Sequence, residues 1–178
     1  MKTLQKTIAI VAFATLLFST NLFAQSATAP VSLRISKALA ISNIGGSLVF
    51  LPVLESGSGS TETITQANGA NFRVTGHPNR AVTITYADVT LTNNQWNTDN
   101  SMPAGNNASM TFEADMNHTG SSSTWAAGTS VSTGGDTHNL VNVTGTGTLY
   151  LWVGGDVDVA AGQNIGDYVG TLTVSVAY

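Results

Sequence analysis

The sequence predicts an all-β fold, an antiparallel β-sandwich of roughly eight to ten strands. Short runs that alternate apolar and polar residues recur along the chain, about 8–12 residues apart. Clusters of Gly, Asn, Ser and Pro separate these runs, as turns between strands require. No window after residue 24 shows the 3.6-residue apolar period of an amphipathic helix. A β-barrel fits the same spacing, and we favour the sandwich.

The first apolar segment of the chain is expected to be a secretory signal peptide that covers residues 1–24. Lys2 and Lys6 precede an uncharged apolar run over residues 8–18, and small residues follow. That run is shorter than the roughly 20 residues that a membrane-spanning helix needs. We therefore expect export, to the cell surface or the medium, with passage through the periplasm if the source is Gram-negative.

Cleavage is expected between Ala24 and Gln25, with cleavage after Ser26 or after Ala27 as the alternatives. Residues 25–178 then form a single β-sandwich domain without a membrane span. This part has no cysteine, so it must be held together by packing and strand pairing. Four basic residues oppose ten acidic residues in it, a net charge of −6. An acidic surface repels phosphate backbones, which argues against nucleic acid as a partner.

The first expected strands lie in the N-terminal third of this domain. Residues 29–35 alternate, with the apolar side chains of Ala29, Val31, Leu33 and Ile35 on one face. Residues 47–54 are almost continuously apolar, which suits a strand buried on both faces.

The middle of the chain carries turn signals between alternating runs. Residues 62–66 and 70–75 flank an Asn-Gly pair at positions 68 and 69, a strong signal for a β-hairpin. Residues 81–86 and 89–92 follow as two further strands.

Residues 109–116 alternate apolar Met, Phe and Ala with Thr, Glu and Asp. Two long polar loops are expected on either side of this strand, over residues 93–107 and 117–135. Residues 138–143 and 146–153 are the next expected strands.

The last expected strand covers residues 171–178. Leu172, Val174, Val176 and Tyr178 form its apolar face, and Thr, Ser and Ala alternate with them. We expect this strand either to close the sandwich or to pair with a partner, and we name these four residues as a candidate assembly strand.

Ionisable residues give no convincing catalytic or metal pattern. Asp156 and Asp158 could contribute to a Ca²⁺ site, but lone acidic pairs are usually solvated. His77, His118 and His138 are far apart in sequence and have no cysteine to complete a zinc site. We expect no cofactor and no enzymatic activity.

Aromatic residues in the long polar loops are candidate ligand contacts. Trp96 and Trp125 lie in these loops, where an exposed indole could stack on a sugar or fill a partner's pocket. The alternative is that each indole folds back and caps one end of the sandwich, because large indoles usually bury most of their surface.

The pattern of residues 161–171, Ala-Gly-Gln-Asn-Ile-Gly-Asp-Tyr-Val-Gly-Thr, leads into Val174, Val176 and Tyr178. It resembles the C-terminus of a secreted bacterial family known only as a domain of unknown function. Residues 30–40, 72–76 and 82–86 resemble its opening and middle strands. A more distant likeness is to the spore-coat-U-type pilins of archaic chaperone–usher systems.

The resemblance implies an immunoglobulin-like β-sandwich with a surface or fimbrial role. It also implies donor-strand exchange, in which an N-terminal segment fills a groove in the next subunit. In that scheme Ala27, Ala29, Val31, Leu33 and Ile35 point inward, and the domain lacks its own first strand. The segment is short and the chain has no disulfide, unlike usual chaperone–usher subunits.

The leading hypothesis is a non-enzymatic surface structural or adhesive protein, similar to a pilin subunit, whose terminal strands recruit a further copy or another surface subunit. The alternative is a secreted carbohydrate-binding module that presents Trp96 and Trp125 to a glycan.

Overall fold

The computed structural model describes residues 28–54 and 57–178, so the expected signal peptide lies outside the described residues. The chain divides into two units, Met1–Arg34 and Ile35–Tyr178. No helix in the described ranges is long and apolar enough to cross a membrane. The expected strand at residues 29–35 is wrong, because residues 28–39 are extended without a ladder partner. Their apolar side chains are exposed, 96% for Val31 and 86% for Leu33.

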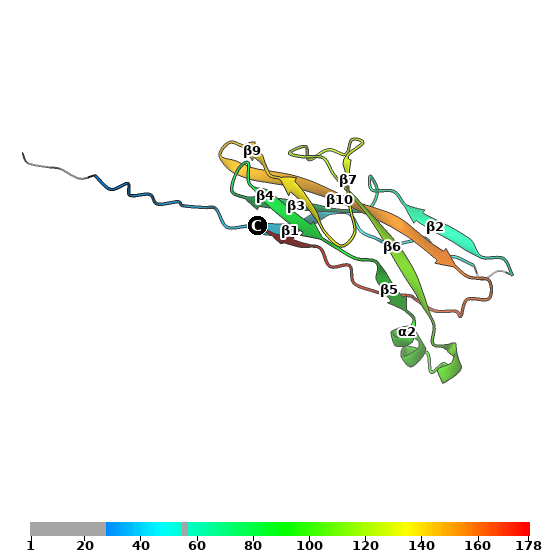
Figure 1. Cartoon of the computed structure of the whole chain (residues 1–178). Helices are drawn as coiled ribbons and strands as arrows, with labels where there is room; N and C mark the ends of the chain where they lie inside the picture. Colours follow the sequence, from blue (N-terminus) through cyan, green and yellow to red (C-terminus); the bar gives the residue numbers. More distant parts are fainter. Residues whose placement is uncertain (1–27, 55–56) are drawn as a thin grey trace, which may run out of the picture. The chain divides into compact units, whose positions relative to one another are not determined.

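Eleven strands lie in the described residues and form two antiparallel sheets, which confirms the predicted all-β sandwich (Figure 1). The larger sheet has the order β1-β3-β10-β6-β5; β2 and β9 also pair with β10, and β7 pairs with β6. The smaller sheet has the order β11-β4-β8. The strands are β1 (Ala40–Gly45), β2 (Ser60–Ile64), β3 (Ala70–Gly76), β4 (Ala81–Thr85), β5 (Val89–Thr92), β6 (Ser109–His118), β7 (Thr129–Val131), β8 (Asp136–Asn139), β9 (Val141–Val143), β10 (Thr146–Val159) and β11 (Ser175–Ala177).

The long strand β10 organises the larger sheet. Its first half pairs with β3 and its second half with β2, both on the side opposite β6. The predicted hairpin around Asn68 and Gly69 is therefore wrong. A turn does form there, with the Asn68 N–H donating to the Thr65 carbonyl at 2.9 Å. However, β2 and β3 continue in line along β10 instead of pairing with each other.

The core lies between the two sheets where they face each other. Alternation places the side chains of Val82 and Ile84 inward from β4, and both are fully buried. On β6, Phe112, Ala114 and Met116 point inward and are buried. These inward faces agree with the alternation predicted for residues 81–86 and 109–116.

Several expected boundaries are corrected. The loop at 93–107 contains a six-residue helix, α2 (Asn94–Asp99), and a short 3₁₀ turn, η1 (Ala104–Asn106). The loop at 117–135 contains β7, and the expected strand 138–143 is divided between β8 and β9, which belong to different sheets. Only Ser175–Ala177 of the expected last strand forms a ladder. Local alternation fixes which side chains point inward, but it does not say which neighbour a strand finds.

Candidate functional site

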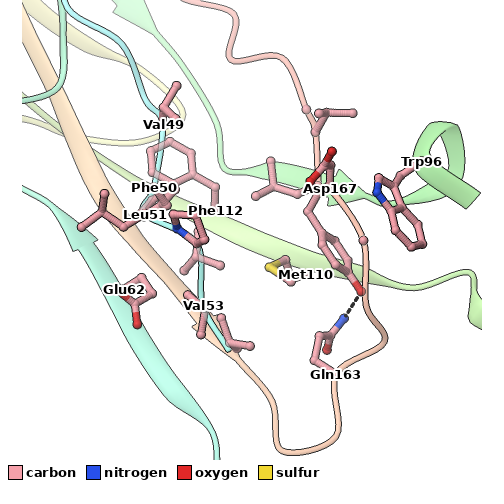
Figure 2. Close-up of a pocket in the computed structure, with 18 of the residues that line it drawn as sticks. Val49, Phe50, Leu51, Val53, Glu62, Trp96, Met110, Phe112, Gln163 and Asp167 are labelled. Atoms are coloured by element: carbon pink, nitrogen blue, oxygen red, sulfur yellow. Dashed lines mark hydrogen bonds between the residues drawn. The ribbon is translucent and has the colours of Figure 1, made fainter. Parts of the chain in front are cut away.

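An apolar groove of about 670 Å³ lies on the inner face of the larger sheet (Figure 2). Its floor is made by side chains of β5, β6 and β10: Leu91, Met110, Phe112, Val157 and Val159. One wall is residues 47–54, here named the apolar cover. The other wall is the C-terminal arm, residues 163–174, of which residues 163–170 line the groove.

The apolar cover was expected to be a strand buried on both faces, and this expectation is wrong. It is extended without ladder pairing, and its backbone forms no hydrogen bond with any described residue. Leu48 and Phe50 point inward and pack on the core, where the Phe50 ring meets the Phe112 ring edge-on at 5.9 Å. Val49 and Leu51 are 77% and 82% exposed. The cover is thus held by two inward side chains.

The C-terminal arm is fixed to β5 at one point. The N–H and C=O of Val169 both hydrogen-bond with Thr92, at 3.0 Å each. In an extended chain the backbone groups of neighbouring residues point to opposite edges. Those of Tyr168 and Gly170 therefore point away from β5, and neither backbone hydrogen-bonds with another described residue. Both walls of the groove thus carry backbone donors and acceptors without partners in the described chain.

A buried asparagine fixes the closed end of the arm. Asn93 is fully buried, and its side-chain amide donates to the carbonyls of Asn106 and Ile165, at 2.9 and 3.0 Å. Its Oδ1 accepts from the N–H of Ala108 at 2.9 Å and from the amide of Asn97 at 3.1 Å. The four bonds tie α2, η1 and the arm together. Nothing in the sequence distinguished Asn93 from the other asparagines of this polar stretch.

Among the described residues, the charged side chains that line the groove are both acidic, Glu62 on β2 and Asp167 on the arm. Tyr168 adds a phenol, which donates to the Asn164 carbonyl at 2.6 Å and accepts from Gln163 at 2.8 Å. This lining favours an apolar ligand that is neutral or basic.

The candidate assembly residues lie along the arm and β11. Leu172, Val174 and Val176 are half-buried and pack against the core of their own chain. Tyr178 is tied down differently: its hydroxyl donates to the Lys37 carbonyl at 2.9 Å and accepts from the His77 N–H at 2.6 Å. These contacts connect the C-terminus to the start of the sandwich.

The structure does not bring the two candidate ligand-contact tryptophans together. Trp96 lies on α2, half-buried, and lines the groove (Figure 2). Trp125 is half-buried in the stretch before β7, with its ring edge-on to the buried Trp152 at 5.7 Å, and is not part of the groove. Trp152 donates through Nε1 to the Thr119 hydroxyl at 2.9 Å.

The candidate ionisable residues lie elsewhere. Asp156 and Asp158 are exposed on the outward face of β10, where Asp158 accepts from the Thr61 hydroxyl at 2.5 Å. Within the described ranges no three His, Asp or Glu side chains are arranged to hold a metal ion. His118 and His138, distant in sequence, have ring centroids 4.2 Å apart.

Residues 9–178 match a family model described as a domain of unknown function, DUF4402. No curated protein matches the chain.

Proposed function

This chain belongs to the DUF4402 family, a domain of unknown function, and we propose that it is an exported, non-enzymatic structural or adhesive subunit of the cell surface that assembles by strand addition. The observation that carries the proposal is the apolar groove, whose two walls present backbone groups without partners in the described residues. In the proposed assembly, an extended segment from a partner lies between the apolar cover and the C-terminal arm.

A strand suits this groove better than a compact ligand. Open strand edges pair readily with extended peptides, and the backbone hydrogen bonds supply affinity while alternate side chains fill pockets. Here the cover and the arm offer two edges, and the apolar floor accepts every second side chain of an incoming strand. Such a strand would fill the layer opposite β5, β6 and β10.

Residues 29–35 of a second copy are the proposed incoming strand. Ala29, Val31, Leu33 and Ile35 repeat with the period of two that the floor requires. The seven residues would span about 23 Å at roughly 3.3 Å each, comparable to the eight-residue cover. Arg34 also makes this segment positive, which favours its approach to a groove whose charged lining residues, Glu62 and Asp167, are both acidic.

Cysteine cross-linking tests this arrangement, since the natural chain contains no cysteine. One preparation carries Leu33→Cys and a second carries Met110→Cys, a floor residue of the groove. After the two are unfolded together, refolded and oxidised, we expect a disulfide-linked heterodimer, measured by mass spectrometry. Ser32→Cys replaces Leu33→Cys in the matched control, because residue 32 faces away from the floor and should cross-link much less.

Two outcomes contradict the proposal. Equal cross-linking from positions 32 and 33 would mean that the segment has no defined register in the groove. A monomer that carries both Leu33→Cys and Met110→Cys and forms the disulfide within one chain at high dilution would mean that the segment fills its own groove. Light scattering and electron microscopy of residues 25–178 add an independent measurement, for which we expect a ladder of oligomers or filaments.

Carbohydrate binding is the second candidate, and its support is the position of Trp96 in the lining of the groove. An indole at such a site can stack on a sugar ring. Glycan-array binding that Trp96→Ala abolishes and Trp125→Ala leaves intact would support this function. If no glycan binds the unsubstituted protein, this candidate fails.

A further inference from the structure

Three titratable side chains occupy inward-facing positions at one edge of the sandwich. His118 continues the inward face of β6. On β8, His138 and Asp136 lie directly opposite Val82 and Ile84 of β4, whose side chains are fully buried. Residues that face each other across a ladder project to the same side of the sheet. The alternation therefore directs these two polar groups toward the space between the sheets.

The two histidines join the layers. His118 belongs to the larger sheet and His138 to the smaller sheet, and their rings lie 4.2 Å apart at 57°. The chain crosses from one sheet to the other at this edge, through residues 132–135 between β7 and β8. Those strands have only three and four residues. The histidine contact thus lies where the ladders are short.

The proton positions in the cluster follow from its hydrogen bonds. Nδ1 of His118 accepts from the Gly120 N–H at 3.3 Å, so the neutral ring carries its proton on Nε2. Nε2 of His138 is buried and 3.3 Å from the Asp136 carboxylate, without the alignment of a hydrogen bond. Asp136 accepts from the N–H of Thr137 at 2.8 Å and of Ser132 at 3.4 Å, which lowers its pKa.

Few other charges act on the cluster. β4 and β7 have no ionisable side chains, and β10 presents Leu151 opposite His118. Glu113 and Asp115 project from the outward face of β6. Burial lowers the pKa of His118, and His138 lowers it further, while Asp136 acts in the opposite direction. Of the described acidic groups, Asp136 is therefore the one that faces the histidines.

We propose that His118, His138 and Asp136 form an acid-sensitive clasp between the two sheets. A proton on Nδ1 of His118 would place a positive charge between the sheets and remove the acceptor of the Gly120 N–H, with the His138 ring centroid only 4.2 Å away. Separation of β8 from β6 lets water solvate the charged His118 ring.

The sign of the pH effect follows from proton linkage. In the opened edge His118 regains its ordinary pKa of 6.5, whereas in the closed edge its pKa is lower. As the pH falls below 6.5, the state in which β8 is separated from β6 therefore binds more protons than the state in which they are in contact. The equilibrium shifts toward separation until the pH has passed below the lowered pKa of His118. The loss amounts to about tenfold in the closing equilibrium for each unit between the two pKa values.

Amide hydrogen exchange between pH 7.5 and pH 4.5, corrected for intrinsic rates, tests the clasp on residues 25–178. We expect protection in β7 and β8 to fall with pH while protection in β3 and β10 stays constant. His118→Gln should remove this fall, because glutamine takes no proton. His77→Gln is the matched control, since His77 is outside the cluster, and it should respond to pH like the unsubstituted protein.

Histidine ring titration by NMR gives a second test that does not depend on how the variants fold. We expect His118 to titrate below 6.5 in the unsubstituted protein, and its midpoint to rise in His138→Gln. An ordinary midpoint that His138→Gln leaves unchanged would overturn the clasp. A pH response of β8 that persists unaltered in folded His118→Gln would overturn it as well.

Discussion

The two halves of β10 face different surroundings. Along residues 146–153 the larger sheet is opposed by the smaller one, and inward side chains there are fully buried, among them Val82, Ile84, Leu149 and Leu151. Beyond residue 155 it is opposed by the apolar cover and the C-terminal arm. There the opposing side chains, Leu48 and Phe50 among them, are only half-buried. This second half of β10 contributes to an apolar floor, as in a β-sandwich, but no hydrogen-bonded strands of the described residues form an opposing sheet over it.

This difference separates two requirements of a β-sandwich. Apolar burial alone is enough to hold the cover against the floor, since Leu48 and Phe50 reach the core without help from backbone pairing. A rigid layer needs the ladder as well, because paired backbone groups fix register and spacing. The half without a second ladder is consequently the half that has room for another chain.

Hydrogen exchange should show the largest contrast between the halves. The amides of residues 48–51 have no acceptor in the described chain, so we expect them to exchange at nearly the rate of an unfolded peptide. Those of Leu149 and Leu151 should exchange only on global unfolding, which typically costs about 5–15 kcal/mol. Residue-resolved exchange at neutral pH measures both. Strong protection of residues 48–51 in the monomer would contradict the comparison.

A matched pair of leucines tests the same contrast by substitution. Leu151 is fully buried, so Leu151→Ala should lower the free energy of unfolding by about 2–5 kcal/mol. Leu51 is 82% exposed on the cover, and Leu51→Ala should change it by no more than about 0.5 kcal/mol. Urea unfolding followed by tryptophan fluorescence gives both values. A large cost at Leu51 in the monomer would show that the cover is packed more tightly than its exposure indicates.

Asn93 tests the link between the groove and its closed end. Asn93→Ala leaves the carbonyls of Asn106 and Ile165 without this donor, and we expect a loss of about 1–3 kcal/mol. The neighbouring Asn94 is exposed, and Asn94→Ala serves as the control with little expected change. Thermal unfolding measures the stability, and Trp96 emission reports on α2. Equal effects of the two substitutions would argue against Asn93 as an anchor.

The smallest expected effect is on the pH dependence of stability and concerns Asp136, which lies on β8, an edge strand of the smaller sheet. Its lowered pKa comes first from the N–H groups of Thr137 and Ser132. The ionised form is therefore preferred in the folded state, and its contribution is lost as the pH falls from 3.8 through the lowered value. Asp136→Asn should flatten the stability curve in that window. Unfolding midpoints between pH 5 and pH 2.5 measure it, and an unchanged slope would contradict the assignment.

The alternating strands were the easier part to predict from sequence. Residues 81–86 and 109–116 alternate cleanly because one face is buried and the other is solvated, which gives the period of two. The continuous apolar run at 47–54 carried no such information. It fits a strand buried on both faces, yet Val49 and Leu51 are exposed because no strand of the described residues covers them.

Which strands pair with each other could not be predicted from local sequence patterns. The Asn68–Gly69 turn exists, but whether the strands around it pair with each other or with a third strand depends on residues 146–159. The His118–His138 contact and the hydrogen bond from Asn93 to Ile165 also join positions distant in sequence. Periodicity is a property of single segments, so it does not identify these partners.

The in-line placement of β2 and β3 along β10 has a mechanical consequence. A tension applied along the axis of β10 shears its ladders with β2, β3, β6 and β9 in parallel. Many hydrogen bonds must then break in one event, whereas a pull across the sheet would open them one after another. If the domain is loaded from end to end, as the proposed structural function requires, β10 is the strand that carries the tension.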